Sequence, residues 1–376
     1  MGTLEKTKLC LIQNFAPHYR ETIFSMINSN YDCDWFLGKP IDGIKEMDVR
    51  KLNNVSYYKS VGNPHVIYYK LGIIKLLFKK KYQNFFMLAE SRSISDWIFF
   101  LLYSVLFPQK KVYIWTHGWK GKESGLNAKL HLWLYKHVSG TFVYGDYAIK
   151  LLIDEGIPAS KLFPIHNSLD YDNQLRIRRN ITLIDIYKKH FSNDNPTIIF
   201  IGRLTKSKKL ELLIEALSIL KSREKAFNLV LIGDGEEKEI LQLQSKQLGL
   251  EHCVWFYGAC YDDNVNAELI YNADLCVSPG NIGLTAIHVL TFGCPAITHN
   301  DARWQGPEFE AIRPGVTGDF FEKDNLNDLV RVIDLWFSNQ QGKRTEVRQA
   351  CYGEIDKNWN PYYQMDIIKK NLILNN

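Results

Sequence analysis

The chain has 376 residues, of which 46% are hydrophobic and 23% charged, enough for sizeable cores and more than one domain of ordinary size. Its seven cysteines are scattered without a CxxC pair, which is typical of buried thiols in a reducing compartment and argues against a disulfide scaffold or a metal site. The first residues lack the apolar core of a signal peptide, and the most apolar run, 97–107, is shorter than the roughly 20 residues that cross a bilayer, so we expect a cytoplasmic protein.

Charge is distributed unevenly along the chain. Residues 1–180 carry a net charge of +10 and the remainder a net charge of −5. Over 66–82, five lysines alternate with apolar residues and no acid occurs. This composition predicts a basic amphipathic helix that contacts an anionic membrane surface through the Lys70–Lys81 region, and the alternative is a solvated helix over an ordinary core. Nucleic acid suits the chain less well, because its aromatic residues follow core spacing instead of forming a stacking platform.

Strands and helices alternate through the first half. Helices are expected after residue 17, over 97–107, over 125–137 and from residue 146. Polar side chains follow two of the expected strands: His18 and Arg20 come after the first, and His117 ends the strand at 111–115. The short apolar runs that predict buried strands are 8–13, 33–37, 55–58, 84–88, 111–115, 141–144 and 162–165.

A second alternation begins after a polar segment, 176–195, that has no clear periodicity and predicts a linker. It has expected strands at 197–201, 228–232, 254–257 and 274–277, with helices between them. This order predicts an α/β protein of two Rossmann-like, doubly wound domains that face a central cleft, with ligands at the carboxyl ends of the strands. The expected domains are an N-terminal domain at 1–175 and a C-terminal domain at 196–355, with a tail at 356–376 that packs back on the first.

The stretch 274–297, DLCVSPGNIGLTAIHVLTFGCPAI, predicts a strand, a glycine turn, a helix and a further strand. Gly280 and Gly283 allow a sharp turn and a close approach of the backbone to a ligand. The free N–H groups at the start of the helix are suited to a phosphate. An ordinary strand–helix turn without a ligand fits this stretch equally well.

Four segments, in their order and spacing, carry a family resemblance. GRLTKSKKLELLIEAL, LVLIGDGEE, VWFYG and SPGNIGLTAIHVLTFGCPAI resemble the second domain of GT-B glycosyltransferases, specifically retaining glycosyltransferase family 4 of the bacterial surface-glycan type. The resemblance covers 197–322 well and the first half more loosely, through NFAPHYR, WTHG and HNSLD. It implies transfer of a sugar from a nucleotide-sugar donor, with retention at the anomeric carbon and without a metal or other cofactor. It also implies that the N-terminal domain at 1–175 binds the acceptor and that the C-terminal domain at 196–355 binds the nucleotide-sugar.

The resemblance also implies roles for individual residues. Arg203 and Lys208 fall on the basic pair that holds the donor diphosphate, and His117 falls on a histidine beside the transferred sugar. Without the resemblance, the two cations would be solvated and His117 would be a structural histidine. His18 and Arg20 are expected on the acceptor side. The residues expected on the donor side are Gly280, Asn281, Ile282, Gly283, Leu284, Thr285, His288, Gly233, Tyr257 and Glu310.

Two positions depart from the family pattern. The family has two glutamates separated by seven residues, and here those positions are Gly280 and His288. Gly280 removes a carboxylate that ordinarily approaches the donor sugar, whereas the imidazole of His288 still offers a donor and an acceptor for ribose hydroxyls. The segment HNDARWQGP, ahead of Glu310, is longer than usual and is expected to reshape the sugar pocket.

The expected function is that of a retaining, metal-independent glycosyltransferase at the inner face of a bacterial cell membrane. Its acceptor is expected to be a lipid-linked saccharide of lipopolysaccharide, capsule or exopolysaccharide synthesis. A catalytically silent GT-B scaffold of a glycan-assembly complex and a GT-B sugar-nucleotide epimerase are the alternatives. An epimerase needs no lipid-facing surface, and a scaffold need not keep Arg203 and Lys208.

Overall fold

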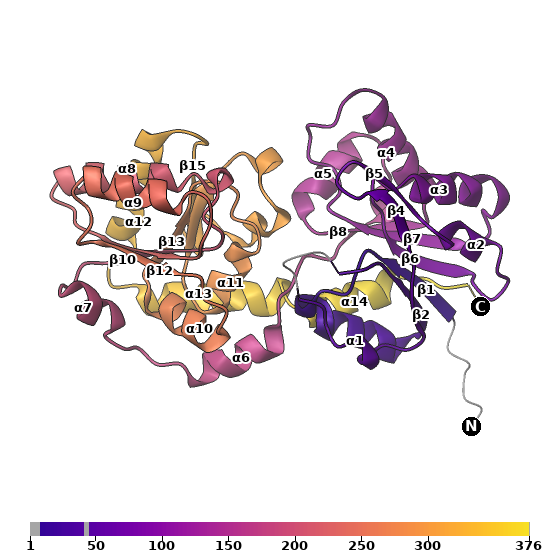
Figure 1. Cartoon of the computed structure of the whole chain (residues 1–376), viewed down its shortest axis with the longest axis horizontal. Helices are drawn as coiled ribbons and strands as arrows, with labels where there is room; N and C mark the ends of the chain where they lie inside the picture. Colours follow the sequence, from indigo (N-terminus) through magenta and orange to yellow (C-terminus); the bar gives the residue numbers. More distant parts are fainter. Residues whose placement is uncertain (1–7, 41–44, 376) are drawn as a thin grey trace. The chain divides into compact units, whose positions relative to one another are not determined.

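The computed structural model describes residues 8–40 and 45–375. Contacts divide the chain into two compact units, which we describe separately. Unit 1 comprises Met1–Asp170 and Pro361–Asn376, and unit 2 comprises Tyr171–Asn360. Figure 1 colours the chain from its N-terminus to its C-terminus and labels the elements of both units.

Unit 1 contains a seven-stranded parallel sheet and a small antiparallel hairpin. The sheet strands are β1 (Lys8–Gln13), β2 (Asp32–Leu37), β3 (Val55–Tyr57), β6 (Asn84–Leu88), β7 (Lys111–Thr116), β8 (Gly140–Val143) and β9 (Leu162–Pro164), in the order β3-β2-β1-β6-β7-β8-β9. The hairpin pairs β4 (Ser60–Asn63) with β5 (Ile67–Lys70). The helices are α1 (Glu21–Asn30), α2 (Ile73–Leu77), α3 (Ile94–Leu106), α4 (Gly125–His137), α5 (Asp146–Asp154) and α14 (Pro361–Asn371), with 3₁₀ turns at His18–Arg20, Val49–Lys51 and Ala159–Lys161.

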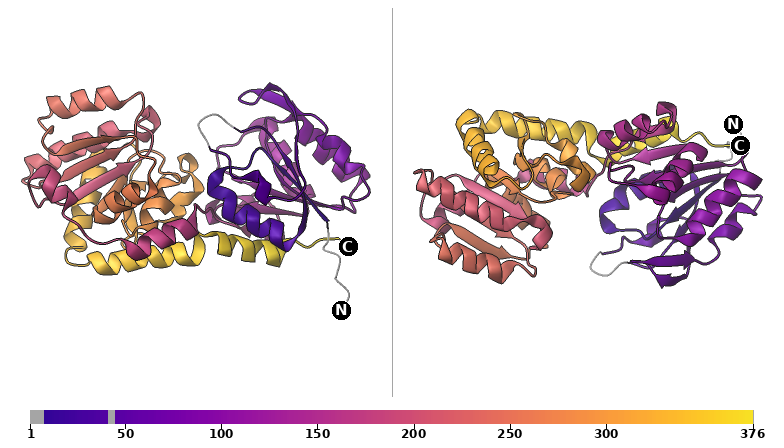
Figure 2. Two further views of the ribbon diagram at one scale, coloured as in Figure 1. Left: turned by 60° about the horizontal axis from the view of Figure 1, so that its bottom comes forward. Right: turned by 90° about the horizontal axis from the view of Figure 1, so that it is seen from above.

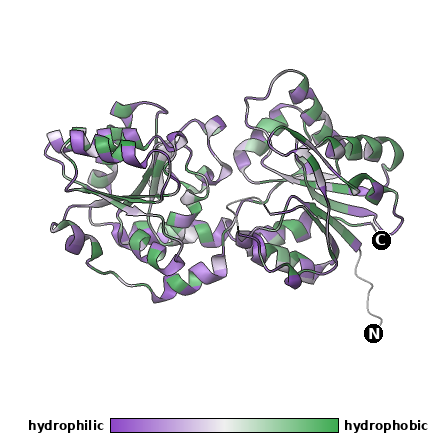
Figure 3. Cartoon of the chain, in the orientation of Figure 1, coloured by the Kyte–Doolittle hydropathy of each residue, from purple (hydrophilic) through white to green (hydrophobic). Residues whose placement is uncertain are grey.

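Helices cover both faces of this sheet (Figure 2). Successive side chains of a strand point to opposite faces, so β1 contributes to two cores. Cys10 and Ile12 pack with α2, α3 and α4, whereas Leu9 and Leu11 pack with α1 and α14. Because both faces are covered, the central strands are mostly apolar along their buried lengths, and Figure 3 shows green stretches within the sheet.

Unit 2 contains a six-stranded parallel sheet in the order β12-β11-β10-β13-β14-β15. Its strands are β10 (Thr197–Ile201), β11 (Asn228–Ile232), β12 (Val254–Gly258), β13 (Leu275–Ser278), β14 (Ala296–His299) and β15 (Gly318–Phe321). Its helices are α6 (Tyr171–Asn180), α7 (Ile186–Phe191), α8 (Leu210–Ser222), α9 (Lys238–Gln247), α10 (Asp263–Asn272), α11 (Thr285–Thr291), α12 (Leu326–Asn339) and α13 (Arg344–Asn358), with 3₁₀ turns at Lys206–Lys208, Ala302–Trp304 and Pro307–Ala311. This strand order is that of a doubly wound Rossmann fold, which confirms the predicted fold class.

The segment expected as a linker and the C-terminal tail both pack on the units. Ile177 of α6 and Tyr187 of α7 are buried in the core of unit 2, and the hydroxyl of Tyr187 donates a hydrogen bond to the carbonyl oxygen of Leu269 at 2.6 Å. In the tail, α14 packs against α1 and buries Met365 and Ile368 in unit 1. All seven cysteines are described and unpaired, and six of them are buried.

The prediction of one basic helix over 66–82 is wrong in its extent. The segment forms β5, a turn at Gly72 with φ +87°, and the five-residue helix α2. Lys70 points inward and is completely buried, because two carboxylates from a later part of the chain neutralise it. Lys81 is tied to Asp34 at 2.8 Å. Lys70 is therefore not available to a membrane, whereas the side chain of Lys81 remains 55% exposed beside Asp34.

A buried ion pair joins the β4–β5 hairpin to α3. The Nζ of Lys70 lies 2.9 Å from Oδ2 of Asp96 and 3.2 Å from Oε2 of Glu90. The backbone N–H of Lys70 donates to the Ser95 hydroxyl at 2.9 Å. Although burial opposes the charged form, the nearby Asp96 carboxylate raises the pKa of Lys70 above its ordinary value, so the ammonium stays charged.

Replacing Lys70 should therefore destabilise unit 1 strongly. Lys70→Met leaves the Asp96 and Glu90 carboxylates without their cation, and breaking such a buried pair typically costs about 3–5 kcal/mol. Urea unfolding followed by tryptophan fluorescence measures the change. Lys79→Met is the matched control, because Lys79 is exposed, and its free energy of unfolding should change by less than about 0.5 kcal/mol. Equal stabilities of the two variants would show that the pair is not structural.

Candidate functional site

The candidate donor site lies at the switch point of the unit 2 sheet. β10 and β13 are neighbours in the sheet, although the helices α8, α9 and α10 and the strands β11 and β12 lie between them in sequence. In such sheets, ligands bind at the carboxyl ends of strands where the strand order reverses. The loops that follow β10 and β13 carry Arg203, Lys208 and the glycine turn, so the topology brings these predicted residues together.

Backbone contacts hold the two loops against each other. The N–H of Gly280 donates to the carbonyl oxygen of Lys208 at 2.9 Å, and the ammonium of Lys208 donates to the carbonyl oxygen of Asn281. A Cβ at position 280 would lie 2.0 Å from the carbonyl oxygen of Ser207, so this close approach requires glycine. A glutamate cannot occupy position 280 with the loops in this arrangement.

The turn presents backbone N–H groups ahead of α11. Gly283 has φ +54°, a conformation that glycine adopts without strain. Among the described residues, no acceptor is bonded to the N–H groups of Gly283 and Leu284, whereas that of Ile282 donates to Oε1 of Gln305 at 3.0 Å. The hydroxyl of Thr285 donates to the carbonyl oxygen of Ile201 at 3.0 Å and fixes the start of α11 on β10.

Two cations accompany these N–H groups. Burial lowers the pKa of Lys208, and the positive charge of Arg203 lowers it further. Arg203 is exposed, and within the described part of the chain neither cation forms an ion pair with a carboxylate. Like charges held together beside unpaired donors form a site suited to an anion.

The other residues expected on the donor side have different positions. His288 is half-buried on α11 with its ring against Phe292, and burial lowers its pKa to about 4, so it is neutral at pH 7. Gly233 follows β11, and a Cβ there would lie 1.9 Å from the carbonyl oxygen of Gly202. Tyr257 of β12 packs beside Trp255, with ring centroids 5.0 Å apart. Glu310 lies on the 3₁₀ turn Pro307–Ala311.

The segment between β14 and this 3₁₀ turn contributes residues that sequence reasoning missed. Gln305 is buried and donates through Nε2 to the Thr298 hydroxyl at 2.9 Å while it accepts from Ile282. The side chain of Asn281 accepts from the N–H of Gly306 at 3.3 Å. Glu308 is also buried, and its charge acts to raise the pKa of Lys208. The unusual length of HNDARWQGP indicated that this segment would affect the site. No periodicity in it showed which of its side chains would be buried.

In unit 1, the predicted residues His117 and Arg20 lie in one cluster around Tyr144. Arg20 donates to the Tyr144 hydroxyl and lies over the ring of Trp115, with 5.1 Å from Cζ to the centroid. The rings of His117 and Tyr144 are 4.9 Å apart. Desolvation of the His117 ring, followed by the positive charges of Lys120 and Arg20, lowers its pKa to about 4. His18 is exposed and bonds instead to the carbonyl oxygen of Lys45.

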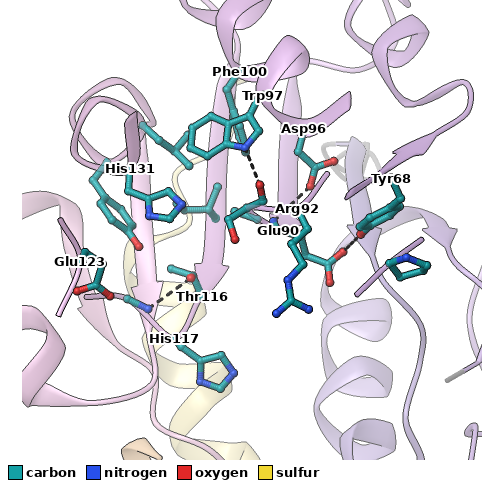
Figure 4. A pocket seen from close by; sticks show the side chains of 17 residues that line it. Tyr68, Glu90, Arg92, Asp96, Trp97, Phe100, Thr116, His117, Glu123 and His131 are labelled. Carbon is teal, nitrogen blue, oxygen red and sulfur yellow. Dashed lines mark hydrogen bonds between the residues drawn. The ribbon is translucent and has the colours of Figure 1, made fainter. Parts of the chain in front are cut away.

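A pocket with a volume of about 330 Å³ adjoins His117 at the carboxyl ends of β6 and β7 (Figure 4). Its wall includes the stacked rings of Trp97 and His131, whose centroids are 5.4 Å apart. Glu90 and Arg92 follow β6 and also line it. Sequence reasoning missed these four residues. The polar stretch AESRSISD directly after a buried strand could have indicated Glu90 and Arg92, but not Trp97 or His131. An aromatic wall with charged groups beside it is suited to a sugar ring and its hydroxyls.

Adding one methyl group at the glycine turn should disturb the donor loops. In Gly280→Ala, the new Cβ meets the backbone of Ser207 and Lys208, which no rotamer change can relieve. We expect a loss of about 1–3 kcal/mol in the free energy of unfolding, as for other overpacked sites. Gly353→Ala is the control, because it lies in α13 with open space around its Cβ and should gain up to about 1 kcal/mol. Chemical denaturation measures both, and a neutral Gly280→Ala would contradict the contact.

Comparisons with known sequences agree with this geometry. Residues 184–353 match the family model described as glycosyl transferases group 1. An uncharacterized glycosyltransferase of Methanocaldococcus jannaschii is 28% identical over 175 residues, which are 46% of this chain and 41% of that protein. An uncharacterized 41.2 kDa protein in the cps region of Klebsiella pneumoniae is 23% identical over 299 residues, 75% of this chain and 76% of that one. The chain thus matches less than half the length of the archaeal relative.

Solved structures share the fold over nearly the whole chain. The lipopolysaccharide outer core galactosyltransferase WaaB has a TM-score of 0.68 at 15% identity, covering 97% of this chain and 100% of that one. Anabaena HepE, in a crystal structure with UDP, also has a TM-score of 0.68 at 15% identity, covering 96% and 99%. The chain therefore has the GT-B fold that these structures share, and its residues 184–353 match the model of the glycosyl transferases group 1 family.

Proposed function

We propose that the protein transfers a sugar from a nucleotide-sugar donor to a saccharide acceptor, with retention at the anomeric carbon. The observation that carries this proposal is the arrangement at the unit 2 switch point, where Arg203, Lys208 and the free N–H groups of Gly283 and Leu284 come together. A nucleoside diphosphate is a leaving group that needs this combination of cations and oriented dipoles.

The proposed chemistry relies on positioning and electrostatics. When the glycosidic bond to the donor breaks, negative charge develops on the diphosphate, and Arg203 and Lys208 stabilise it without a metal ion. The acceptor hydroxyl attacks from the face that the diphosphate leaves, and the departing phosphate oxygen takes the acceptor proton. No carboxylate nucleophile is required on this route, which agrees with glycine at position 280.

Relatives support a place in bacterial surface-glycan synthesis. The Klebsiella relative is encoded in a cps region, and WaaB is a galactosyltransferase of the lipopolysaccharide outer core. The crystal structure of HepE contains UDP, so we propose a uridine-based donor as the first to test. We infer that the acceptor is a lipid-linked saccharide and that the protein works at the inner face of the cell membrane.

Unit 1 supplies the proposed acceptor side. The pocket beside His117 offers the Trp97 ring for stacking and the Glu90 carboxylate and Arg92 guanidinium for sugar hydroxyls. With its pKa near 4, His117 is neutral at pH 7, so it can hydrogen-bond a sugar hydroxyl without adding charge. Arg20 acts behind it, through Tyr144, as a positioning residue.

Removing one cation should weaken catalysis without unfolding the protein. We expect Arg203→Ala to lower kcat/KM about 10²–10³-fold, the effect of deleting one preorganised charge partner. A thermal-shift screen of nucleotide-sugars first identifies the donor, because a ligand at 100 times its Kd adds about 2.7 kcal/mol of stability. Transfer is then measured with that donor.

Arg223→Ala is the matched control for this experiment. Arg223 is also an exposed arginine of unit 2, but it follows the last residue of α8, at the opposite end of that helix from Lys208. Its replacement should leave kcat/KM unchanged. Wild-type transfer by Arg203→Ala would remove the diphosphate assignment. A failure of every nucleotide-sugar and nucleoside diphosphate to stabilise the wild type would favour the silent scaffold.

His288 tests the position at which this chain departs from its family. If the imidazole contacts the ribose of the donor, His288→Ala should raise the donor Kd about tenfold, which corresponds to about 1.4 kcal/mol. His288→Glu should recover part of the affinity, because it restores the carboxylate of the family pattern. Calorimetric titrations normalised to the folded fraction measure both. If His288 only packs against Phe292, both variants lose stability and bind the donor as the wild type does.

A further inference from the structure

The outer side of α3 is an apolar surface that no described residue covers. Its inner side buries Phe99, Phe100 and Tyr103, so an ordinary surface helix would have polar residues outside. Instead, the outward positions follow the spacing i, i+4, i+7 and i+11 and are all aliphatic. They are Ile94, Ile98, Leu101 and Val105, exposed by 41%, 36%, 54% and 67%. The only charged residue of α3, Asp96, is buried.

Exposed apolar side chains also occur on the neighbouring helices. Phe78, just after α2, is 58% exposed and packs edge-on against Phe107, with ring centroids 5.1 Å apart. On α4, whose His131 stacks on Trp97 of α3, Leu126 and Leu130 are 74% and 43% exposed. Figure 3 shows the largely green α3 beside α4. Several exposed apolar side chains on neighbouring helices indicate an interaction site, since single scattered ones would need no explanation.

Exposed lysines occur on the same helices. Residues 51–89 contain seven lysines and no acid, and residues 97–145 contain six lysines and one acid, Glu123, although Lys70 and Lys110 are buried. The Glu123 carboxylate is turned back onto backbone N–H groups, accepting from Lys120 at 3.0 Å. The exposed lysines on or directly after α2 and α4 are Lys75, Lys79, Lys80, Lys129 and Lys136. The helices that carry the exposed apolar side chains therefore also carry positive charge.

We propose that this surface, the outer face of α3 with Phe78, Leu126, Leu130 and the exposed lysines of these helices, docks on a bilayer rich in anionic lipid. Acyl chains accept the apolar side chains, and phosphate headgroups pair with the lysines. A second copy of the chain fits less well, because a symmetric contact would bring the same lysines face to face. No helix in the described part of the chain is long and apolar enough to span a membrane, so the docked helix lies in the plane of the interface.

The same helices line the pocket of unit 1. Trp97 and Phe100 of α3 and His131 of α4 face the pocket, while Ile98 and Leu101 face outward. Docking therefore holds the pocket close to the headgroups, where the saccharide of a lipid-linked acceptor lies. This last step rests on the proposed function, whereas docking itself does not.

Vesicle flotation without substrates tests the docking surface. Wild-type protein should float with vesicles of 30% phosphatidylglycerol in phosphatidylcholine and bind pure phosphatidylcholine far more weakly. Leu101→Asp/Val105→Asp should abolish flotation, because it places two carboxylates on the apolar face. Lys75→Gln/Lys79→Gln/Lys80→Gln should weaken binding roughly a hundredfold, since each lysine near an anionic surface contributes about fivefold.

A charge-matched control comes from unit 2. Ile240 and Leu243 on α9 are each 57% exposed, and Ile240→Asp/Leu243→Asp should float as the wild type does. Circular dichroism shows whether each variant is folded. If the α3 variant, Leu101→Asp/Val105→Asp, does not fold, the lysine variant still tests the surface.

The proposal is overturned if the wild type fails to bind anionic vesicles, or if the folded α3 variant binds them as tightly as the wild type does. It is also overturned if the wild type binds no vesicles and light scattering shows that it is a dimer whereas the α3 variant is a monomer, because the surface would then be a subunit interface. If the wild type binds anionic vesicles but transfers no sugar, the result contradicts the proposed function and not the docking surface.

Discussion

The close backbone contact between Gly280 and Lys208 is the constraint on which the donor-side geometry depends. Because β10 and β13 are adjacent, the loops that follow them would be near one another in any case, but the 2.9 Å hydrogen bond brings their backbones into direct contact. The Lys208 ammonium then reaches the carbonyl oxygen of Asn281. Cations and free N–H groups are thus held in place before an anion arrives, which is what makes electrostatic stabilisation effective.

This contact also leaves no room for the glutamate that the family pattern has at position 280. A side chain there would collide with the carbonyl oxygen of Ser207. The segment after β14 also contacts the turn, because Gln305 accepts a hydrogen bond from the N–H of Ile282 and the N–H of Gly306 donates to Asn281. The turn is thus held by the loop after β10 and by the segment after β14.

Local patterns in the sequence predict the features that depend on neighbouring residues. Alternating apolar strands and amphipathic helices predict both doubly wound sheets. The family resemblance, carried by short local motifs, is what indicates Arg203, Lys208 and His117. Features that depend on distant partners were missed. The burial of Lys70 follows from Asp96, 26 residues further on, so its segment resembled a basic surface helix. The pocket wall of Trp97 and His131 joins two helices in the same way, and no spacing within either helix indicates it.

The uneven charge of the chain has a consequence for where each anion is bound. The half from residue 181 onward is net negative, so its long-range field repels a nucleotide-sugar, and binding there depends on the short-range contacts of Arg203 and Lys208. The first half has a charge of +10, and exposed lysines and exposed apolar side chains occur on the same helices, α2 and α4 with the outer side of α3 between them in sequence. A field of that size attracts an extended anionic surface far more than one small ligand, because each lysine adds to the attraction separately. The charge of the first half therefore suits a membrane, and the local cations of the second suit a diphosphate.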